Sequence, residues 1–324
     1  MARMLILGGT GWLSRRVAHH ALADGWEVTC LARGTRPAPD GAVLVEADRD
    51  DPDAYADLTG AWDHVVDVSS HATPVAAAVE ALGDRAARWT YVSSASVYAD
   101  DATRGADESA ARHPAAAPGD AYDYGAQKVA AEDSVIATVG DKALIVRPGL
   151  IGGPGDPSDR FGYWPAAFAR AATGDVLTPS LTGRDAQVID VDDLAAYIVR
   201  SSATGPVTAV GHPHALADVL DEARRAAGHS GRLVEASDDA LRASGVEYWA
   251  GERSLPLWLP DDMPGFMSRS NARYLATGGT LRPLVETIAR TLADERARGL
   301  DRPRRAGLSR RDEEAILAAL AAGM

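Results

Sequence analysis

The chain has 324 residues and a formal net charge of −13, with 46% hydrophobic and 24% charged residues. These values are typical of a soluble enzyme with one dominant core and a smaller second part, and no apolar run approaches the roughly 18 residues of a membrane span. The negative charge opposes nonspecific nucleic-acid binding, because neutralising phosphates requires a concentrated basic surface. The N-terminal sequence lacks the pattern of a secretory signal. We therefore expect a cytoplasmic protein with no nucleic-acid or membrane partner.

Residues that commonly bind metals are few and scattered. Cys30 is the single cysteine, which excludes an intrachain disulfide and a cysteine-based metal cluster. His113, His212 and His214 lie in polar stretches, where solvation explains a histidine better than metal binding does. We therefore predict no metal site.

Short β-branched or apolar runs alternate with helix-like stretches through the first half of the chain. This alternation is typical of a parallel sheet whose two faces are both covered by helices. The predicted fold class is therefore α/β, a Rossmann-type doubly wound parallel sheet. In chain order, strands are predicted at 4–7, 27–32, 42–47, 64–68, 89–93 and 143–147, and helices at 12–23, 53–58, 74–82 and 121–138.

The second half of the chain has a less regular pattern. A Gly/Pro-rich segment at 149–162 interrupts the alternation, and the apolar run at 186–191 indicates a return to the core sheet. Further elements are predicted as helices at 164–172 and 216–227, a strand at 232–235, and a last helix with Ser309 in a capping box.

These patterns divide the chain into two expected domains. Residues 1–149 and 186–211 are predicted to form a dinucleotide-binding Rossmann domain. Residues 150–185 and 212–324 are predicted to form a smaller C-terminal α/β region that binds the substrate. Four aromatic residues of this region are candidates either for covering the substrate or for packing: Tyr163, Trp164, Trp249 and Trp258.

A glycine-rich turn joins the first predicted strand to the first predicted helix. Glycine allows a tight turn, so a pyrophosphate can approach the free N–H groups and the positive dipole at the helix N-terminus. Strand, turn and helix occur in the order that a dinucleotide fingerprint requires, although Ser14 stands where a third glycine is usual. The cofactor-binding residues predicted here are Gly8, Thr10, Gly11, Trp12 and Leu13.

The end of the second predicted strand indicates which nicotinamide dinucleotide is bound. A carboxylate at this position binds the ribose hydroxyls of NAD, whereas this chain has Ala32. Arg33 and Arg36 follow and offer guanidinium groups suited to a 2′-phosphate. We therefore predict NADP as the cofactor, with NAD as the less favoured alternative. Asp48, after the third strand, is predicted to accept a hydrogen bond from the adenine amino group.

Tyr124 and Lys128 are four residues apart and therefore lie on one face of the predicted helix. A neighbouring ammonium favours the phenolate, so we expect it to lower the pKa of the phenol and make Tyr124 a usable acid and base near neutral pH. Ser94 follows a predicted strand, so its hydroxyl lies at the carboxyl edge of the sheet and can bind a substrate oxygen. These three are the predicted catalytic residues.

The motifs resemble those of the extended short-chain dehydrogenase/reductase superfamily, including its NAD-dependent epimerase/dehydratase branch. The resemblance covers residues 4 to about 194 through the glycine-rich turn, Ser-Ser-x-Ser-Val-Tyr, Tyr-x-x-x-Lys and Arg-Pro-Gly. It implies that Ser94 is the active-site hydroxyl, that Tyr124 is the acid and base, and that Lys128 modulates Tyr124. It also implies that Pro148 and Gly149 contact the cofactor, and Ser69 is a further predicted cofactor contact.

Three functions are open on this basis. The leading hypothesis is an NADPH-dependent oxidoreductase, a reductase in which hydride passes to a carbonyl of a small organic substrate, Ser94 polarises the oxygen and Tyr124 supplies the proton. The second is a nucleotide-sugar epimerase or dehydratase, which Ala32 and Arg33 disfavour. The third is a non-catalytic nucleotide-binding regulator. No Gly-x-Ser-x-Gly elbow surrounds Ser94, which disfavours a serine hydrolase. A small molecule is the expected partner, and a homodimer is left open.

Overall fold

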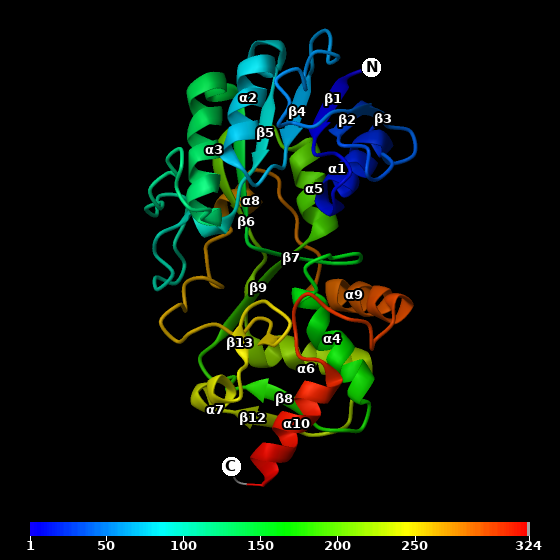
Figure 1. The fold of residues 1–324 in the computed structure, drawn as a ribbon, viewed down its shortest axis with the longest axis vertical. Helices are drawn as coiled ribbons and strands as arrows, with labels where there is room; N and C mark the ends of the chain where they lie inside the picture. The colour runs from blue at the N-terminus through cyan, green and yellow to red at the C-terminus, as the bar shows by residue number, and fades with distance from the viewer. Residues whose placement is uncertain (323–324) are drawn as a thin grey trace.

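A seven-stranded parallel sheet forms the centre of the computed structural model, which describes residues 1–322 (Figure 1). The strand order is β10-β6-β5-β4-β1-β2-β3, and each neighbouring pair is parallel. The order reverses between β1 and β4, and ligands bind at the carboxyl ends of strands at such a switch point. The strands are β1 (Arg3–Leu7), β2 (Glu27–Ala32), β3 (Val43–Glu46), β4 (His64–Asp67), β5 (Trp89–Val92), β6 (Ala143–Pro148) and β10 (Gly205–Ala209).

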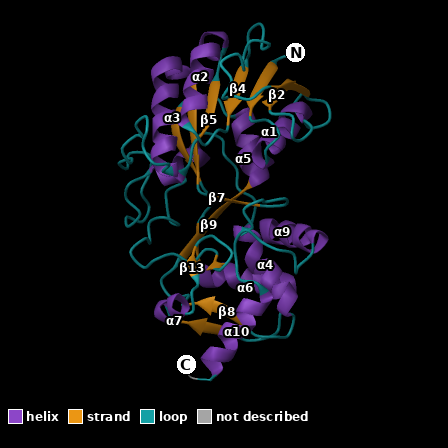
Figure 2. Ribbon diagram, viewed as in Figure 1, coloured by secondary structure: helices purple, strands orange, loops and turns teal. Residues whose placement is uncertain are grey.

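Helices cover both faces of this sheet (Figure 2). Successive side chains of a strand point to opposite faces, so Ile6 of β1 packs into one apolar cluster and Leu7 into the other. Burial on both faces explains why the strands are continuous apolar runs in the sequence. The first face carries α1 (Trp12–Ala23) and α5 (Val191–Arg200), and the second carries α2 (Ala72–Leu82) and α3 (Tyr124–Val139).

Most of the remaining elements form a second region with its own apolar core, below the main sheet in Figure 1, whereas the short helix at Ala272–Ala276 and the 3₁₀ turns belong to the main-sheet half. A three-stranded sheet of order β11-β9-β7 connects the two regions, and separate ladders pair β8 with β12 and β13 with β14. These strands are β7 (Leu150–Gly152), β8 (Val176–Pro179), β9 (Asp185–Asp190), β11 (Pro213–Ala215), β12 (Leu233–Ala236), β13 (Glu247–Tyr248) and β14 (Ser254–Leu255). The other helices are α4 (Arg160–Ala171), α6 (Leu216–Ala227), α7 (Asp238–Ala243), α8 (Ala272–Ala276), α9 (Leu284–Arg298) and α10 (Arg310–Ala321). Short 3₁₀ turns lie at Gly83–Arg85, Ala95–Val97 and Gly140–Lys142.

Two predicted elements differ from the structure. Residues 53–58 form turns instead of a helix, and their backbone N–H groups bind the carbonyl three residues earlier, as in Ala56 to Asp53 and Leu58 to Tyr55, instead of four. The run at 186–191 forms β9, but β9 pairs with β7 and β11 outside the main sheet. The seventh strand of the main sheet is β10, an edge strand that pairs only with β6 and therefore tolerates Pro206.

The two regions alternate along the chain after β6. β9 belongs to the connecting sheet, whereas α5 and β10, which follow it, pack in the main sheet. The domain boundaries expected from the sequence stay a prediction.

Across residues 1–322, no helix has both the length and the apolar character needed to cross a membrane.

Candidate active site

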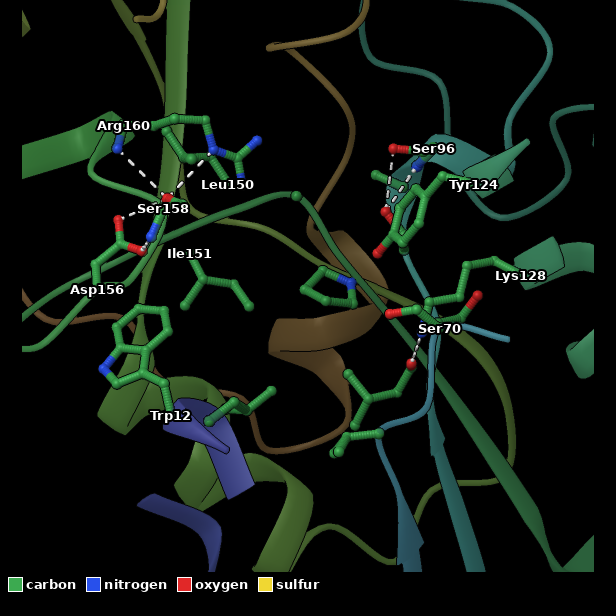
Figure 3. A pocket seen from close by; sticks show the side chains of 18 of the residues that line it. Trp12, Ser70, Ser96, Tyr124, Lys128, Leu150, Ile151, Asp156, Ser158 and Arg160 are labelled. Carbon is green, nitrogen blue, oxygen red and sulfur yellow. Dashed lines mark hydrogen bonds between the residues drawn. The ribbon is translucent and has the colours of Figure 1, made fainter. Parts of the chain in front are cut away.

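A cavity of about 610 Å³ opens at the carboxyl ends of the main-sheet strands (Figure 3). We call it the central cavity. The fold brings residues from widely separated parts of the sequence to its walls, including all three predicted catalytic residues and five of the predicted cofactor contacts. These are Ser94, Tyr124 and Lys128, together with Gly11, Trp12, Leu13, Pro148 and Gly149.

The glycine-rich turn at the edge of this cavity packs directly against β2. A Cβ atom on Gly9 would lie 2.5 Å from the Cβ of Cys30, so no side chain fits there. A Cβ on Gly11 would meet nothing closer than the Ser14 hydroxyl, at 3.4 Å. The backbone N–H groups of residues 12–14 have no acceptor within the described part of the chain. Free N–H groups at the N-terminus of α1, beside an open glycine face, fit the phosphates of a dinucleotide.

A second cavity, of about 440 Å³, lies beside the ends of β2 and β3 and would hold the adenosine half of a dinucleotide. Of the two arginines predicted to bind a 2′-phosphate, only Arg33 borders it. Arg36 does not, although its neighbour Thr35 does. The other predicted contacts in its lining are Gly8, Thr10, Asp48 and Ser69.

The carboxylate that is missing from the end of β2 is present on the neighbouring strand. Ala32 pairs with Glu46 in the ladder between β2 and β3, and a Cβ on Gly34 would lie 2.7 Å from the Glu46 carboxylate. Glu46 is not apparent from the β2 sequence alone, because the register between two strands is a tertiary property. Arg33 lines the second cavity, whereas Glu46 stands just outside its lining, next to Ala47. The two groups of opposite charge therefore lie near the position at which NAD and NADP differ.

A buried ion pair connects the second cavity with the predicted catalytic lysine. Arg49 binds both carboxylate oxygens of fully buried Asp67, at 2.9 and 2.7 Å. Asp67 also accepts from the backbone N–H of Ser69 at 2.9 Å, and the carbonyl of Ser69 accepts from Lys128 Nζ at 2.8 Å. Asp67 ends an apolar run and Arg49 lies in an acidic loop, so neither position indicated this pairing in the sequence.

Tyr124 and Lys128 lie one turn apart at the start of α3, as their spacing predicts. Asp123 caps the helix by accepting from the N–H of Ala126 at 2.7 Å. A Cβ on Gly125 would lie only 2.5 Å from the carbonyl oxygen of Ser96. Glycine at this position therefore lets the start of α3 approach the serine segment closely, which places Tyr124 beside the serines.

Lys128 is buried, and its ammonium contacts backbone carbonyls. Nζ donates to Ser69 at 2.8 Å and to Val92 at 2.6 Å, and it lies 5.9 Å from the centre of the Tyr124 ring. Burial lowers the pKa of Lys128 to about 7, against the opposing attraction of Asp67 and of a second buried carboxylate. Lys128 therefore gains and loses a proton near neutral pH. Its ammonium group points toward the loop after β4.

The side chain of Tyr124 faces the central cavity, and 40% of the residue is exposed. Burial of the phenol raises the pKa of Tyr124, and this effect exceeds the lowering caused by a hydrogen bond with Ser94 and by the charge of Arg160. The predicted lowering of this pKa by Lys128 is therefore wrong for the protein alone, because the ammonium is engaged by carbonyls. Ser94 and Arg160 are the groups that favour the phenolate.

The two consecutive serines after β5 have different surroundings. Ser93 donates to Glu132 at 2.5 Å, and Arg147 holds the same carboxylate through two hydrogen bonds. Ser93 is therefore part of the buried support of the site. Ser94 donates to the hydroxyl of Ser96 at 3.1 Å and lines the central cavity. This geometry supports Ser94 as the hydroxyl that binds a substrate oxygen.

The aromatic residues of the second region are mostly packing residues. Tyr163, Trp164 and Trp258 are buried in its core. Trp249 is the candidate that reaches the central cavity, where its ring stands at 86° to that of Phe266 with 5.3 Å between their centres.

A polar group that no sequence motif indicated lies opposite the serines. Asp156, Ser158 and Arg160 come from the segment that follows β7 and line the central cavity. In the sequence this Gly/Pro-rich stretch shows only an interruption of the pattern, because its cavity-facing residues are fixed by contacts with distant loops.

Histidines and carboxylates are not gathered into a metal centre. Within residues 1–322, no three His, Cys, Asp or Glu side chains are grouped to hold a metal ion. His71 follows β4 and borders the second cavity, with its ring 5.0 Å from that of Tyr122.

Comparisons with known proteins agree with this architecture. Residues 4–209 match the family model described as the NAD dependent epimerase/dehydratase family. The comparison with curated proteins returns no match.

Solved structures with the same fold include three sugar-nucleotide enzymes. UDP-glucose 4-epimerase from Thermotoga maritima, crystallised with UDP-glucose, has a TM-score of 0.68 at 14% identity. UDP-glucose 4-epimerase from Thermus thermophilus, in complex with NAD, has a TM-score of 0.63 at 20% identity. UDP-glucuronic acid 4-epimerase from Bacillus cereus, also with NAD, has a TM-score of 0.66 at 12% identity. Each comparison covers 91% of this chain and 99% of the other, so the fold is shared over nearly the whole of each protein.

Proposed function

Because this chain belongs to the NAD dependent epimerase/dehydratase family, we propose that it is an epimerase that oxidises and then re-reduces one carbon of a nucleotide sugar. The observation that carries this proposal is the central cavity, where Tyr124 and Ser94 lie within reach of the phosphate-binding turn. Similar structures named as UDP-sugar epimerases match over their full length, which supports this reaction over net reduction.

In this reaction Tyr124 and Ser94 act on the same substrate oxygen. To oxidise the hydroxyl, Tyr124 must first lose its own proton, which Ser94 and Arg160 favour and burial opposes. The phenolate then accepts the proton of the substrate, and Ser94 donates a hydrogen bond to the developing carbonyl. A nicotinamide held by the turn at 8–13 and the second cavity would accept the hydride from the carbon and return it to the opposite face of the carbonyl, which inverts that carbon. When the carbon is re-reduced, Tyr124 returns the proton to the oxygen. The protein therefore ends the cycle in its starting protonation state.

A reductase that uses NADPH is the second candidate, and one observation favours it. Arg33 borders the second cavity at the end of β2, where a guanidinium group would meet a 2′-phosphate. Net reduction of a carbonyl consumes one reduced cofactor in every turnover, whereas an epimerase regenerates its cofactor in each cycle.

Product analysis separates the two candidates. The purified protein is incubated with NAD or NADP and with UDP-glucose or UDP-glucuronate, and sugars are resolved by chromatography while reduced cofactor is followed by absorbance. We expect interconversion of the 4-epimers without net change in reduced cofactor. Net oxidation of NADPH with a panel of carbonyl compounds, without sugar interconversion, would replace the epimerase by the reductase.

Tyr124→Phe tests the role of the phenol in either reaction. Removing the proton acceptor is expected to lower turnover by about 100-fold or more, with cofactor affinity retained. Tyr122→Phe is the matched control, because Tyr122 lies two residues earlier, is 55% exposed and does not line the central cavity. Equal activity of the two variants would remove Tyr124 from the mechanism.

A further inference from the structure

Arg160 places a guanidinium group in the wall of the central cavity. It is the first residue of α4, and Figure 3 shows it beside Ser158 and Asp156 on the segment after β7. Its Nε donates to Ser158 Oγ at 3.3 Å. The guanidinium carbon lies 4.9 Å from the centre of the Trp249 ring, which supports one face of the cation.

The terminal nitrogens of Arg160 have no hydrogen-bond or ion-pair partner within residues 1–322, and they are not sealed inside the protein. Arg49 and Arg147, the guanidinium groups buried near the same site, each bind both oxygens of a carboxylate. Asp156 does not serve Arg160 in this way, because its two oxygens accept from the N–H and the hydroxyl of Ser158. Burial lowers the pKa of Arg160, and Asp156 offsets this only in part. The cavity therefore contains a cation with unused donors.

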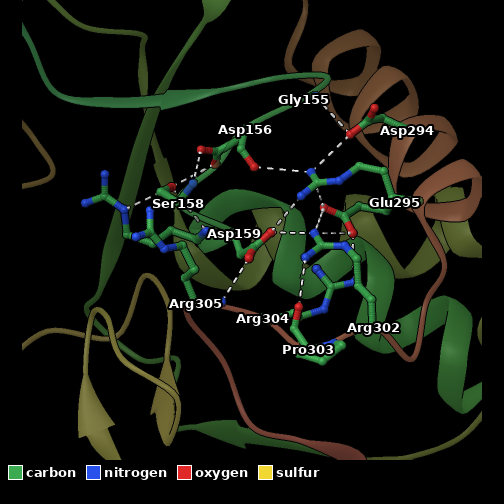
Figure 4. A network of polar contacts seen from close by, with 12 residues as sticks. Gly155, Asp156, Ser158, Asp159, Asp294, Glu295, Arg302, Pro303, Arg304 and Arg305 are labelled. Atoms are coloured by element: carbon green, nitrogen blue, oxygen red, sulfur yellow. Dashed lines mark hydrogen bonds and ion pairs between the residues drawn. The ribbon is translucent and has the colours of Figure 1, made fainter. Parts of the chain in front are cut away.

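The residue before Arg160 has an uncommon backbone conformation, and its side chain lies in a network of polar contacts (Figure 4). Asp159 has φ 60°, in the left-handed region, which is uncommon for residues other than glycine although aspartate and asparagine adopt it more readily than most. Its carboxylate binds the side chains of Arg298 and Arg302 and the N–H of Arg305, the last at 2.9 Å. A cation in the first turn of a helix is also opposed by the helix dipole. An uncommon backbone at Asp159 and an unfavourable charge at Arg160, side by side, are local features typical of a functional site.

We propose that Arg160 is a specificity-determining residue that binds an anionic oxygen group of the substrate, a carboxylate on the sugar or a phosphate of the nucleotide. A guanidinium fork binds either group through two parallel hydrogen bonds. The apolar faces of Trp249 and Phe266 then pack against the rest of the ligand. The substrate extends from Tyr124, where it reacts, to Arg160, where its charge is recognised. The nucleotide-sugar identity of the substrate rests on the proposed function, whereas the anion site rests on the geometry of Arg160.

Arginine labelling tests the anion site without requiring turnover. The full-length protein is treated with phenylglyoxal in the presence of NAD, and modification at each arginine is read by peptide mass spectrometry. We expect Arg160 to react, and glucuronate or inorganic phosphate to protect it, whereas neutral glucose does not. Arg36, which is exposed and borders neither cavity, is the control and should react equally throughout. An unreactive Arg160, or labelling that neither anion reduces, overturns the proposal.

Titration of variants identifies which anion is bound. UDP, UDP-glucose and UDP-glucuronate are titrated by calorimetry into NAD-loaded wild type, Arg160→Gln and Arg160→Lys. If the sugar carboxylate is bound, Arg160→Gln weakens UDP-glucuronate binding by about tenfold to hundredfold and leaves UDP-glucose unchanged. If a phosphate is bound, all three ligands weaken together. Arg160→Lys should restore part of the loss, because it keeps the charge without the fork.

The controls separate this proposal from the proposed function. Unchanged NAD affinity shows that Arg160→Gln is folded, and unchanged affinity for all three ligands in that variant overturns the role of Arg160. A wild-type protein that binds none of them and interconverts no nucleotide sugar contradicts the epimerase instead. In that case, protection of Arg160 by glucuronate or phosphate still decides whether it is an anion site.

Discussion

Lys128 is a buried cation that is held by two backbone carbonyls, and within the described residues no carboxylate forms an ion pair with it. Its pKa in the folded protein is about 7, below the ordinary 10.5. Between these two values the unfolded chain binds more protons than the folded chain, so the free energy of unfolding rises with pH. The contribution of Lys128 reaches at most about 1.4 kcal/mol per pH unit in this window. Below it, the cost of the buried charge is present in full.

Lys128→Met should remove this contribution. We expect the free energy of unfolding of the variant to be most favourable, relative to that of the wild type, at pH 7 and below. As the pH rises toward 10, the wild type gains stability relative to the variant, because only the wild type then loses a buried charge. Lost hydrogen bonds to Ser69 and Val92 shift the comparison by an amount that does not depend on pH. Urea unfolding of both proteins without cofactor, over this range, measures the difference. Parallel stability curves would contradict the lowered pKa.

Substitutions at Arg33 and at Glu46 are expected to have opposite effects on the preference between NADP and NAD. Arg33→Ala is expected to weaken NADP binding by about tenfold, through loss of charge-assisted hydrogen bonds to the 2′-phosphate, and to leave NAD binding unchanged. Glu46→Gln should weaken NAD binding instead, if its carboxylate accepts from the ribose hydroxyls. Arg36→Ala is the matched control, because this residue lies outside the second cavity. Fluorescence titration with both cofactors checks these outcomes, and equal losses in Arg33→Ala and Arg36→Ala would exclude recognition by Arg33.

At the scale of elements, the Rossmann half could be predicted because each of its strands is buried on both faces. Such strands are short continuous apolar runs, and β2 (Glu27–Ala32) and α1 (Trp12–Ala23) have the predicted bounds. The pairing of elements was harder to predict. β9 and β10 are two short runs of similar character, and only the tertiary structure assigns β10 to the main sheet and β9 to the connecting one.

The residues of the candidate site likewise fall into those that could be predicted from the sequence and those that could not. Ser94, Tyr124 and Lys128 could be placed together because each lies at a fixed position on a strand end or a helix that the sequence indicates. Arg160 and Glu46 could not, because their surroundings come from segments distant in the sequence. Trp249 is more than eighty residues after Arg160, yet the two side chains are in contact. Hydrophobic periodicity contains no information on such contacts.

The turn between β1 and α1 gives a prediction that separates stability from binding. Gly9→Ala places a methyl group 2.5 Å from the Cβ of Cys30, which forces the turn away from β2 and should cost about 1–3 kcal/mol of unfolding free energy. Gly11→Ala meets no atom closer than 3.4 Å, so its stability should change by less than about 1 kcal/mol. Its methyl group would instead obstruct the approach of a pyrophosphate and weaken dinucleotide binding. Thermal unfolding and cofactor titration of both variants test this, and equal stability losses would contradict it.

At the scale of the whole molecule, the C-terminal segment supports the cavity wall from behind. Arg298 lies at the end of α9, and Arg302 follows in the next loop, yet both bind Asp159, which directly precedes Arg160 (Figure 4). Arg302 also binds Glu295 on α9 at 3.1 Å. These contacts connect the last forty residues of the chain with the segment that leaves the main sheet. The position of Arg160 in the cavity therefore depends on residues far from the nicotinamide end of the site.

Asp159→Asn tests this dependence. Asparagine tolerates the left-handed backbone, so the substitution removes mainly the charge. Burial alone would raise the pKa of Asp159, but Arg302, the N–H of Arg305 and Arg298 together hold it below the ordinary value. The stabilisation is therefore present above about pH 4 and is lost as the pH falls through the lowered pKa. We expect Asp159→Asn to cost about 1–3 kcal/mol at neutral pH, less than a fully buried pair because both arginines are partly exposed.

The same variant should affect catalysis through Arg160 and leave Tyr124 intact. We expect a higher KM for the nucleotide sugar and nearly unchanged NAD affinity, because the anion contact is displaced while the cofactor is held by other elements. A smaller fall in kcat should accompany it, because a displaced Arg160 no longer lowers the pKa of Tyr124. Asp175→Asn is the matched control, since its ion pair with the exposed Arg232 lies on the surface and contributes little. Urea unfolding and steady-state kinetics of both variants at neutral pH provide the measurement. An unchanged KM in a clearly destabilised Asp159→Asn would show that the C-terminal segment stabilises the fold without positioning Arg160.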